Sequence, residues 1–164
     1  MATAVGDSSV LIHLGAIGQL ELLPALYQLV IVPDAVWREV VLQGKSRPVV
    51  QQVRQAVSSG WLRVATPKNA ALLQVLHQQL HDGEAEAIVL ATEVMPDSLL
   101  MDETDGREFA RRLGLKTRGA VGLLMEAKRL GHIAAIRPWL ERLDQSGFHL
   151  APVFITQVLQ QAGE

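Results

Sequence analysis

The sequence predicts an α/β domain with a mostly parallel sheet. Short apolar runs typical of strands alternate with longer stretches that carry helical periodicity and helix-capping residues, as in parallel sheets. The length of 164 residues is close to that of one domain, and 49% hydrophobic against 20% charged residues fits a buried core. Because no Pro/Ser-rich linker or internal repeat divides the sequence, we expect a single domain over residues 1–164.

The strands of this domain are predicted from five apolar runs. Each run is short, which is typical of strands that helices cover on both faces. The runs are Thr3–Gly6, Leu29–Val32, Trp61–Ala65, Ser98–Met101 and Leu115–Thr117. We therefore expect a sheet of about five strands.

Helix start and stop signals fill the gaps between these runs. Ser8 or Ser9 can cap a first helix, Pro33 starts a second, and Pro48 opens a third that ends before Gly60. Further helices are predicted at Gly83–Val94 after Asp82, at Gly106–Leu113 after Asp105, at Ile133–Gln145 and at Pro152–Ala162, with Gly114 and Gly131 at helix C-termini.

The composition excludes several classes of protein and site. Since the chain has no cysteine, disulfides, thiolate zinc sites, iron–sulfur clusters and cysteine nucleophiles are excluded together. The N-terminus has no basic region, and Asp7 falls where an apolar region would have to form, so a signal peptide is not expected. No stretch reaches the roughly 20 apolar residues that span a bilayer. We expect a cytoplasmic protein without membrane contact.

Charge is distributed unevenly along the chain. Residues 1–105 hold six Lys and Arg against twelve Asp and Glu, whereas residues 106–142 hold nine against three. Two solvated faces of one domain would explain this distribution. The alternative is an acidic cation-binding site beside a surface that binds a polyanion.

The first acidic candidate is Asp7, which directly follows the first predicted strand. A carboxylate at the C-terminal end of a parallel strand lies at the edge where such folds build their sites. Ser8 and Ser9 open the helix after it, so Asp7 is also explained as a second capping residue. Both interpretations remain open from the sequence.

A second acidic group repeats this pattern after the fourth predicted strand. Asp102 follows the apolar run, with Glu103 beside it and Asp105 close behind. Asp105 is well placed to cap the next helix, which gives it a structural interpretation.

Two glutamates compete for a role on the helix over Gly83–Val94. At about 100° per residue, Glu84 lies on the apolar stripe of this helix, whereas Glu86 lies on the opposite face. A glutamate on an apolar stripe costs desolvation unless it meets a cation or a donor, so Glu84 is the better candidate. Its structural interpretation is a favourable position on the helix dipole.

Glu39 is a weaker candidate on the helix that follows Pro33. It falls at the margin of the apolar side of that helix, where a solvated glutamate is the ordinary interpretation.

Several acids at strand ends and helix starts, without cysteine or a histidine cluster, suit a hard divalent cation with oxygen ligands. Mg²⁺ or Mn²⁺ fits best. Such ions activate water and neutralise charge that develops on a phosphate, which is the chemistry of phosphodiester hydrolysis.

The basic segment fits the same substrate class. Arg107 and Arg111 are four residues apart on one predicted helix, and Arg118 and Lys128 follow. Because aromatic residues make up only 4% of the chain, we expect contacts with the phosphate backbone to dominate over base stacking.

Four motifs in order give the chain a family resemblance. VGDSSVLIHL, PDAVWREVV, DGEAEAIVLATE and SLLMDETDGREFARRLGLKTRGAVGLLMEAKRLGHI together resemble PIN-domain proteins, and more narrowly the PIN-like toxins of prokaryotic type II toxin–antitoxin modules. This resemblance implies a three-layer α/β/α fold and a ribonuclease that uses Mg²⁺ or Mn²⁺. It also implies a small antitoxin protein as partner, and it leaves a homodimer open.

The resemblance assigns roles to individual acids. Asp7 matches the first acid of the family, Glu39 the second, Glu84 the third and Asp102 the last. An alternative family phase selects Glu86 as the third acid, and Glu103 is an alternative for the last. Ser8 or Ser9 matches the hydroxyl that supports the first acid.

Other functions fit the sequence less well. Gly6, Asp7 and Ser8 imitate the opening motif of an SGNH-type esterase, but the late histidine base is missing after Asp144. His77 and His81 lack the His-Glu-x-x-His spacing of a zinc site, so they are interpreted as surface helix residues. A PIN fold that binds RNA or protein without catalysis remains the alternative from a different class.

Overall fold

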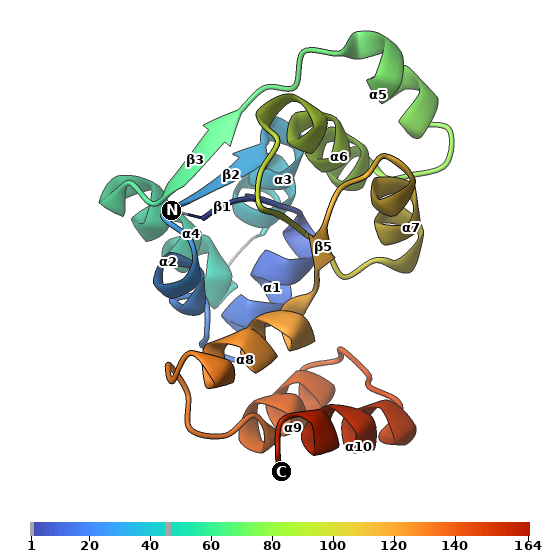
Figure 1. Ribbon diagram of the computed structural model, residues 1–164. Helices are drawn as coiled ribbons and strands as arrows, with labels where there is room; N and C mark the ends of the chain where they lie inside the picture. Colours follow the sequence, from blue (N-terminus) through green and yellow to red (C-terminus); the bar gives the residue numbers. More distant parts are fainter. Residues whose placement is uncertain (1, 45–46) are drawn as a thin grey trace.

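A computed structural model describes residues 2–44 and 47–164 of the protein (Figure 1). Its centre is a five-stranded parallel sheet of order β3-β2-β1-β4-β5. The strands are β1 Thr3–Gly6, β2 Leu29–Pro33, β3 Leu62–Ala65, β4 Ser98–Leu100 and β5 Thr117–Arg118. The predicted sheet is confirmed, and helices on both faces complete the three-layer α/β/α fold.

Alternate strand residues supply two separate cores, one on each face of the sheet. On one face, Ala4, Val30 and Leu100 pack with helices α1 Ser8–Ala16, α2 Leu22–Leu26, α4 Pro48–Ser59 and α8 Ala120–Arg129. On the other, Val5 and Leu99 pack with α5 Ala70–Leu76, α6 Asp82–Val94 and α7 Thr104–Arg112. Burial on both faces explains why the strands are short, uninterrupted apolar runs.

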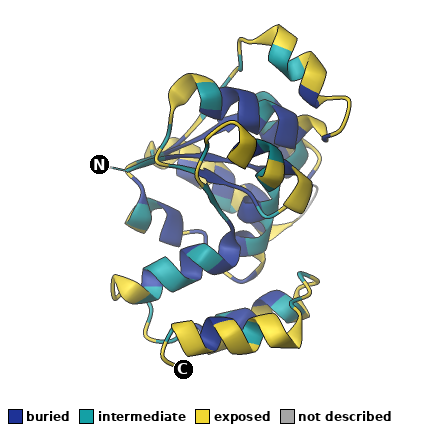
Figure 2. Ribbon diagram, turned by 45° about the vertical axis from the view of Figure 1, so that its right-hand side comes forward, coloured by how far each residue is buried: buried dark blue, intermediate teal, exposed yellow. Residues whose placement is uncertain are grey.

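A third apolar cluster joins the C-terminal helices to the rest of the fold. α9 Arg137–Gln145 and α10 Pro152–Gln161 pack beside each other against α8, and their outer faces are exposed (Figures 1 and 2). The Glu164 carboxylate accepts hydrogen bonds from the Ile136 amide at 2.8 Å and from the Lys128 ammonium at 2.9 Å. These bonds hold the end of α10 against α8 and the start of α9, and they lower the pKa of Glu164 to about 2.

Several predicted boundaries are wrong, and tertiary contacts explain the differences. β5 begins at Thr117, two residues late, because the Leu115 amide donates to the Ala110 carbonyl and so closes the end of α7. α9 begins at Arg137, four residues late, since the Ile136 amide is bonded to Glu164. The short helices α2 and α5 were not predicted.

The predicted helix caps also need correction. The cap of α1 is Asp7, whose side chain accepts from the Ser8 amide, and neither serine takes that position. Asp82 is the first residue of α6, after His81 at the cap position. α7 begins at Thr104 with Glu103 at its cap position, so Asp105 lies inside the first turn and does not cap the helix.

The segment after β2 changes its helical geometry within two turns. A short α-helix, α3 Asp34–Trp37, follows Pro33 as predicted and continues directly into a π-helical stretch, η1 Arg38–Leu42. The wider turn is rare in proteins and is frequently found at functional sites. It carries Glu39.

The strand order creates a switch point beside β1. The chain moves from β1 through β2 to β3 on one side, and β4 and β5 lie on the other. In open α/β sheets, ligands bind outside the carboxyl ends of the strands at this point. Asp7 follows β1 and Asp102 lies two residues beyond β4, so both lie at this edge. Within the described part of the chain, no helix is long and apolar enough to cross a membrane.

Close packing of α1 on α4 predicts the outcome of a glycine substitution. A Cβ on Gly15 would lie 2.6 Å from Cγ2 of Val49, so Gly15→Ala should lower the free energy of unfolding by about 1–3 kcal/mol through overpacking. Gly122→Ala in α8 is the matched control, because its Cβ would meet only the flexible Arg118 side chain at 3.1 Å. The control should be neutral or stabilising by up to about 1 kcal/mol. Urea unfolding of both variants measures the difference, and equal effects would contradict this packing.

Candidate active site: an acidic pocket at the switch point

A pocket of about 460 Å³ opens at the switch point of the sheet. Four carboxylates line it: Asp7 after β1, Glu39 on η1, Glu84 on α6 and Glu103 before α7. His13 on α1 and His81 before α6 also line it. Segments that are far apart in sequence therefore bring acids to one place, as predicted, although the fourth acid at the pocket is Glu103.

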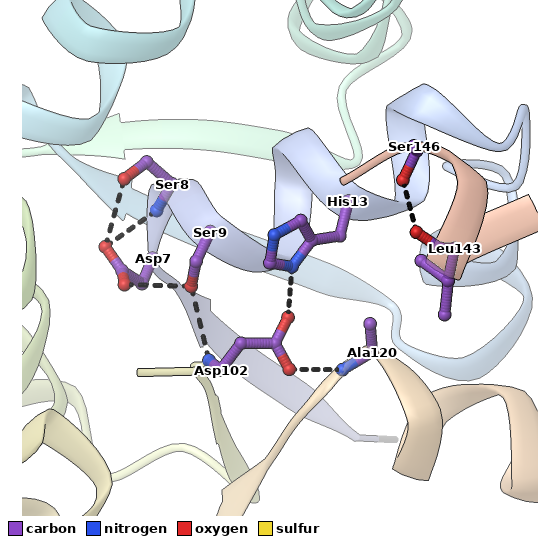
Figure 3. A network of polar contacts seen from close by, with 8 residues as sticks. All are labelled: Asp7, Ser8, Ser9, His13, Asp102, Ala120, Leu143 and Ser146. Atoms are coloured by element: carbon purple, nitrogen blue, oxygen red, sulfur yellow. Dashed lines mark hydrogen bonds and ion pairs between the residues drawn. The ribbon is translucent and has the colours of Figure 1, made fainter. Parts of the chain in front are cut away.

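Asp7 is the most deeply buried acid of the pocket, with 1% of its surface exposed. One carboxylate oxygen accepts from the Ser8 amide at 2.7 Å, and the other accepts from the Ser9 hydroxyl at 3.1 Å (Figure 3). Asp7 is both a helix cap and a residue of the site, because its carboxylate caps α1 and also lines the pocket. Burial outweighs these hydrogen bonds and, with the nearby charge of Glu39, raises the pKa of Asp7 from 3.8 to about 6.

Glu39 is held in the pocket by two donors, so the solvated interpretation is wrong. Its Oε2 accepts from the Ser8 hydroxyl at 2.7 Å, and its Oε1 accepts from the Gly83 amide at 3.2 Å. A Cβ on residue 83 would lie 2.8 Å from Oε1. Glycine at this position is therefore what lets the carboxylate reach the start of α6.

The two glutamates of α6 point to different neighbours, as the helical phase predicted. Glu84 is 8% exposed, lines the pocket and has its pKa raised from 4.5 to about 7 by burial and by the charge of Asp7. Glu86 points to α3, where it accepts from the Ala35 amide at 3.2 Å and lies 3.7 Å from the Arg38 guanidinium. Its side chain is only 12% exposed, so the face of α6 opposite the apolar stripe is also covered at this position.

Asp102 does not line the acidic pocket. One of its oxygens lies 2.7 Å from Nδ1 of His13, and the other accepts from the Ala120 amide at the start of α8 at 2.9 Å (Figure 3). Its own amide donates to the Ser9 hydroxyl at 3.2 Å. Asp102 therefore ties α1 to α8 behind the pocket wall, while Asp105 is exposed in the first turn of α7.

Sequence reasoning missed the two histidines of the pocket. His13 lies four residues after Ser9 on α1, so a helical spacing from the Asp7 motif places both on one face of the helix. His77 and His81 were interpreted as surface helix residues. His77 does pair with the exposed Asp82 at 3.2 Å, but His81 lies at the cap position of α6 and lines the pocket.

The four predicted phosphate-binding cations lie in different surroundings, although Arg118 and Lys128 line one cavity together. Arg107 and Arg118 line a second cavity, beside Asp102. Arg111 is exposed on α7. The ammonium of Lys128 is bonded to Glu164, so its charge is already paired within the chain.

The donor set of the pocket fits a hard divalent cation such as Mg²⁺ or Mn²⁺. Its acidic side chains offer carboxylate oxygens, and Asp7, Glu39 and Glu84 take part in no ion pair among the described residues. Within that part of the chain, however, no three acidic or histidine side chains are close enough to hold an ion as they stand. The raised pKa values of Asp7 and Glu84 fit acids that lack a countercharge.

Comparison with known proteins places the chain in a family. A family model described as a PIN domain matches residues 3–164. The chain belongs to the PIN-domain family. The resemblance of the four motifs to PIN-domain proteins is thereby confirmed.

Among solved structures, this PIN domain is similar to a PilT N-terminus domain protein from the hyperthermophilic archaeon Sulfolobus solfataricus P2. The two chains are 18% identical, the match covers 76% of this chain and 92% of the other, and the TM-score is 0.49. The comparison with curated proteins gives no significant match.

The raised pKa values predict how the pocket affects stability. Between about pH 4 and pH 7 the folded protein binds more protons at Asp7 and Glu84 than the unfolded chain does, so these groups make it less stable as pH rises. In EDTA, Asp7→Asn should raise the free energy of unfolding at about pH 8 by about 1–3 kcal/mol, with little effect at about pH 4. Asparagine keeps the oxygen that caps α1.

Urea unfolding across this pH range measures the effect. Glu141→Gln is the control, since Glu141 is exposed on α9 and lies outside the pocket. The bonds of Glu164 add stability that is lost as pH falls from about 4.5 towards 2, and this loss is the same in the wild type and both variants. A destabilisation by Asp7→Asn that is equal at all pH values would contradict the prediction.

Proposed function

We propose that this PIN domain is a metal-dependent ribonuclease that hydrolyses RNA phosphodiester bonds in the acidic pocket. PIN domains are commonly nucleases. The observation that carries the proposal is that Asp7, Glu39 and Glu84 come from three segments to line one pocket. None of the three has an ion-pair partner among the described residues. Charge of this kind costs stability unless a ligand uses it.

In this proposal Asp7, Glu39 and Glu84 hold Mg²⁺ or Mn²⁺, with Glu103 or Asp102 as the fourth acid. A bound divalent ion supplies a water of lowered pKa and neutralises charge on the phosphate. The other roles are those of the protein's own side chains. Ser8 and Ser9 orient the carboxylates of Glu39 and Asp7 through their hydroxyl groups, which keeps acceptor oxygens directed at the pocket.

Asp102 has a supporting part in this proposal unless it turns toward the pocket. Its carboxylate is engaged by His13 and by the Ala120 amide, so a direct role requires at least the His13 contact to break. Glu103 needs no such change, since it already lines the pocket. RNA is held by arginines beside the pocket, with Arg107 and Arg118 as the principal contacts and Arg111 as an outer one.

The same proposal includes a toxin role and a small antitoxin protein that blocks the acidic pocket in the resting cell. The support for this part is the resemblance of the motifs. An arginine of such a partner suits the pocket, because a guanidinium pairs with carboxylates through two parallel hydrogen bonds.

Cleavage that depends on metal and on Asp7 tests the central claim. The protein should cleave RNA with Mg²⁺ or Mn²⁺ and stop in excess EDTA, and Asp7→Asn should lower the rate by more than about 100-fold, because it removes a ligand oxygen from the ion. Product formation on labelled RNA measures the rate. Cleavage that survives EDTA contradicts the mechanism. Binding of Mn²⁺ and RNA without cleavage would favour the non-catalytic binding module instead.

A matched pair of variants on α6 tests which glutamate serves the site. Glu84→Gln should lower cleavage by more than about 100-fold, because the side chain lines the pocket. Glu86→Gln should keep most activity, because its partners, Ala35 on α3 and Arg38 at the start of η1, lie outside the pocket. Both changes remove one charge from the same helix, so each controls for the other. The rate with saturating Mn²⁺ is the measurement. Loss of activity in Glu86→Gln alone would mean that the alternative family phase is correct.

A further inference from the structure

A second cavity, of about 420 Å³, shares a wall with the acidic pocket. Asp102 lines this cavity, and the His13 ring, which lines the acidic pocket, is bonded to Asp102. The other walls come from β5, α8, the segment before α10 and α10 itself. We call it the C-terminal cavity. It adjoins the site where cleavage is proposed at the bond between His13 and Asp102, but its chemistry is different.

The C-terminal cavity carries a net positive charge, since two arginines and one carboxylate, that of Asp102, line it. Arg107 and Arg118 line it, and neither takes part in an ion pair in the part of the chain that the structure describes. Nε of Arg107 is buried without a hydrogen-bond partner there, and a Cβ on residue 119 would lie 2.9 Å from its Nη1. The cavity therefore favours an anion.

The same cavity is also aromatic. Phe148 lines it and stacks on the His13 ring with centroids 4.0 Å apart and an interplanar angle of 16°. Phe154 on α10 also lines it, with 41% of its surface exposed. A flat, weakly polar ring is the ligand group that such a face accepts, and guanidinium groups stack on the same rings.

A nucleotide combines an anionic phosphate with a flat base, so it matches both features of the cavity. We propose that the C-terminal cavity holds one nucleotide of the RNA strand beside the cleaved bond, with its phosphate on Arg107 and Arg118 and its base against Phe154. This inference rests on the proposed ribonuclease function. The position of this cavity next to the acidic pocket favours a polynucleotide over a free anion, because phosphates repeat along one strand and neighbouring phosphates can lie at both cavities. The cavity then gives the enzyme a sequence preference at one position.

Binding in EDTA separates this cavity from catalysis. The probe is a short single-stranded RNA of mixed sequence that carries fluorescein, and anisotropy gives the Kd at several salt concentrations. Phe154→Leu keeps an apolar side chain but removes the ring, and it should weaken binding about five- to a hundredfold. Arg107→Gln should weaken binding and lower the slope of log K against log salt by about 0.7.

Arg63→Gln is the matched control for charge. Arg63 is exposed on β3, the strand at the opposite edge of the sheet from β5, so this variant should bind RNA as the wild type does. A second readout maps the cut sites in the presence of Mn²⁺. Phe154→Leu should change the nucleotide preference at one position next to the cut and leave the other positions alone. A nucleoside monophosphate should compete with RNA better than inorganic phosphate does, and Phe154→Leu should remove that advantage.

The failures of the two proposals are distinguishable. If the wild type cleaves RNA with Mn²⁺ while Phe154→Leu and Arg107→Gln bind and cut as it does, the cavity proposal is overturned and the ribonuclease stands. If Arg63→Gln weakens binding as much as Arg107→Gln, the effect is one of general charge and the cavity proposal is again overturned. If both cavity variants bind RNA normally but lose a partner protein, the cavity is a protein interface. If the wild type neither binds nor cleaves RNA, both proposals fail.

Discussion

The rest of the site depends on one constraint, the buried carboxylate of Asp7 at the switch point of the sheet. β1 lies between β2 and β4, and the Asp7 amide extends the pairing with β4 by donating to the Leu100 carbonyl at 2.9 Å. The side chain is 1% exposed and takes the first amide of α1 and the Ser9 hydroxyl as donors. A carboxylate that begins a helix in this way fixes the direction of that helix.

The start of α1 in turn sets the positions of the other acids. Ser8 reaches Glu39, Ser9 reaches the Asp102 amide, and His13, one turn later, reaches the Asp102 carboxylate. The same histidine stacks on Phe148 in the segment between α9 and α10. A single helix therefore links the acids of the pocket to α8 and the C-terminal helices. The burial of Asp7 and Glu84 works against the stability of this arrangement. Ionising either carboxylate in its buried position costs free energy, which is why both pKa values are raised.

The sequence predicted the parts of this arrangement that depend on local pattern. Acids that follow apolar strands fall at the switch point, and the helical phase of α6 separates Glu84 from Glu86. The parts it did not predict depend on distant partners. Asp102 turns away because His13 and the start of α8 offer donors, and Lys128 is paired with a residue 36 positions later. Neither partner leaves a signal in the local sequence.

Glu39 illustrates why spacing alone places such residues poorly. As an ordinary amphipathic helix, the segment after Pro33 puts this glutamate at the margin of the apolar side. The π-helical geometry of η1 changes the phase, and Gly83 leaves room for the carboxylate at the start of α6. Gly119 does the same for Asp102, since a Cβ there would collide with Oδ1. Gly83 therefore belongs to the acidic site as much as the acids do, and Gly119 has the same part for Asp102 behind the pocket, because each makes the space into which a carboxylate from another segment must fit.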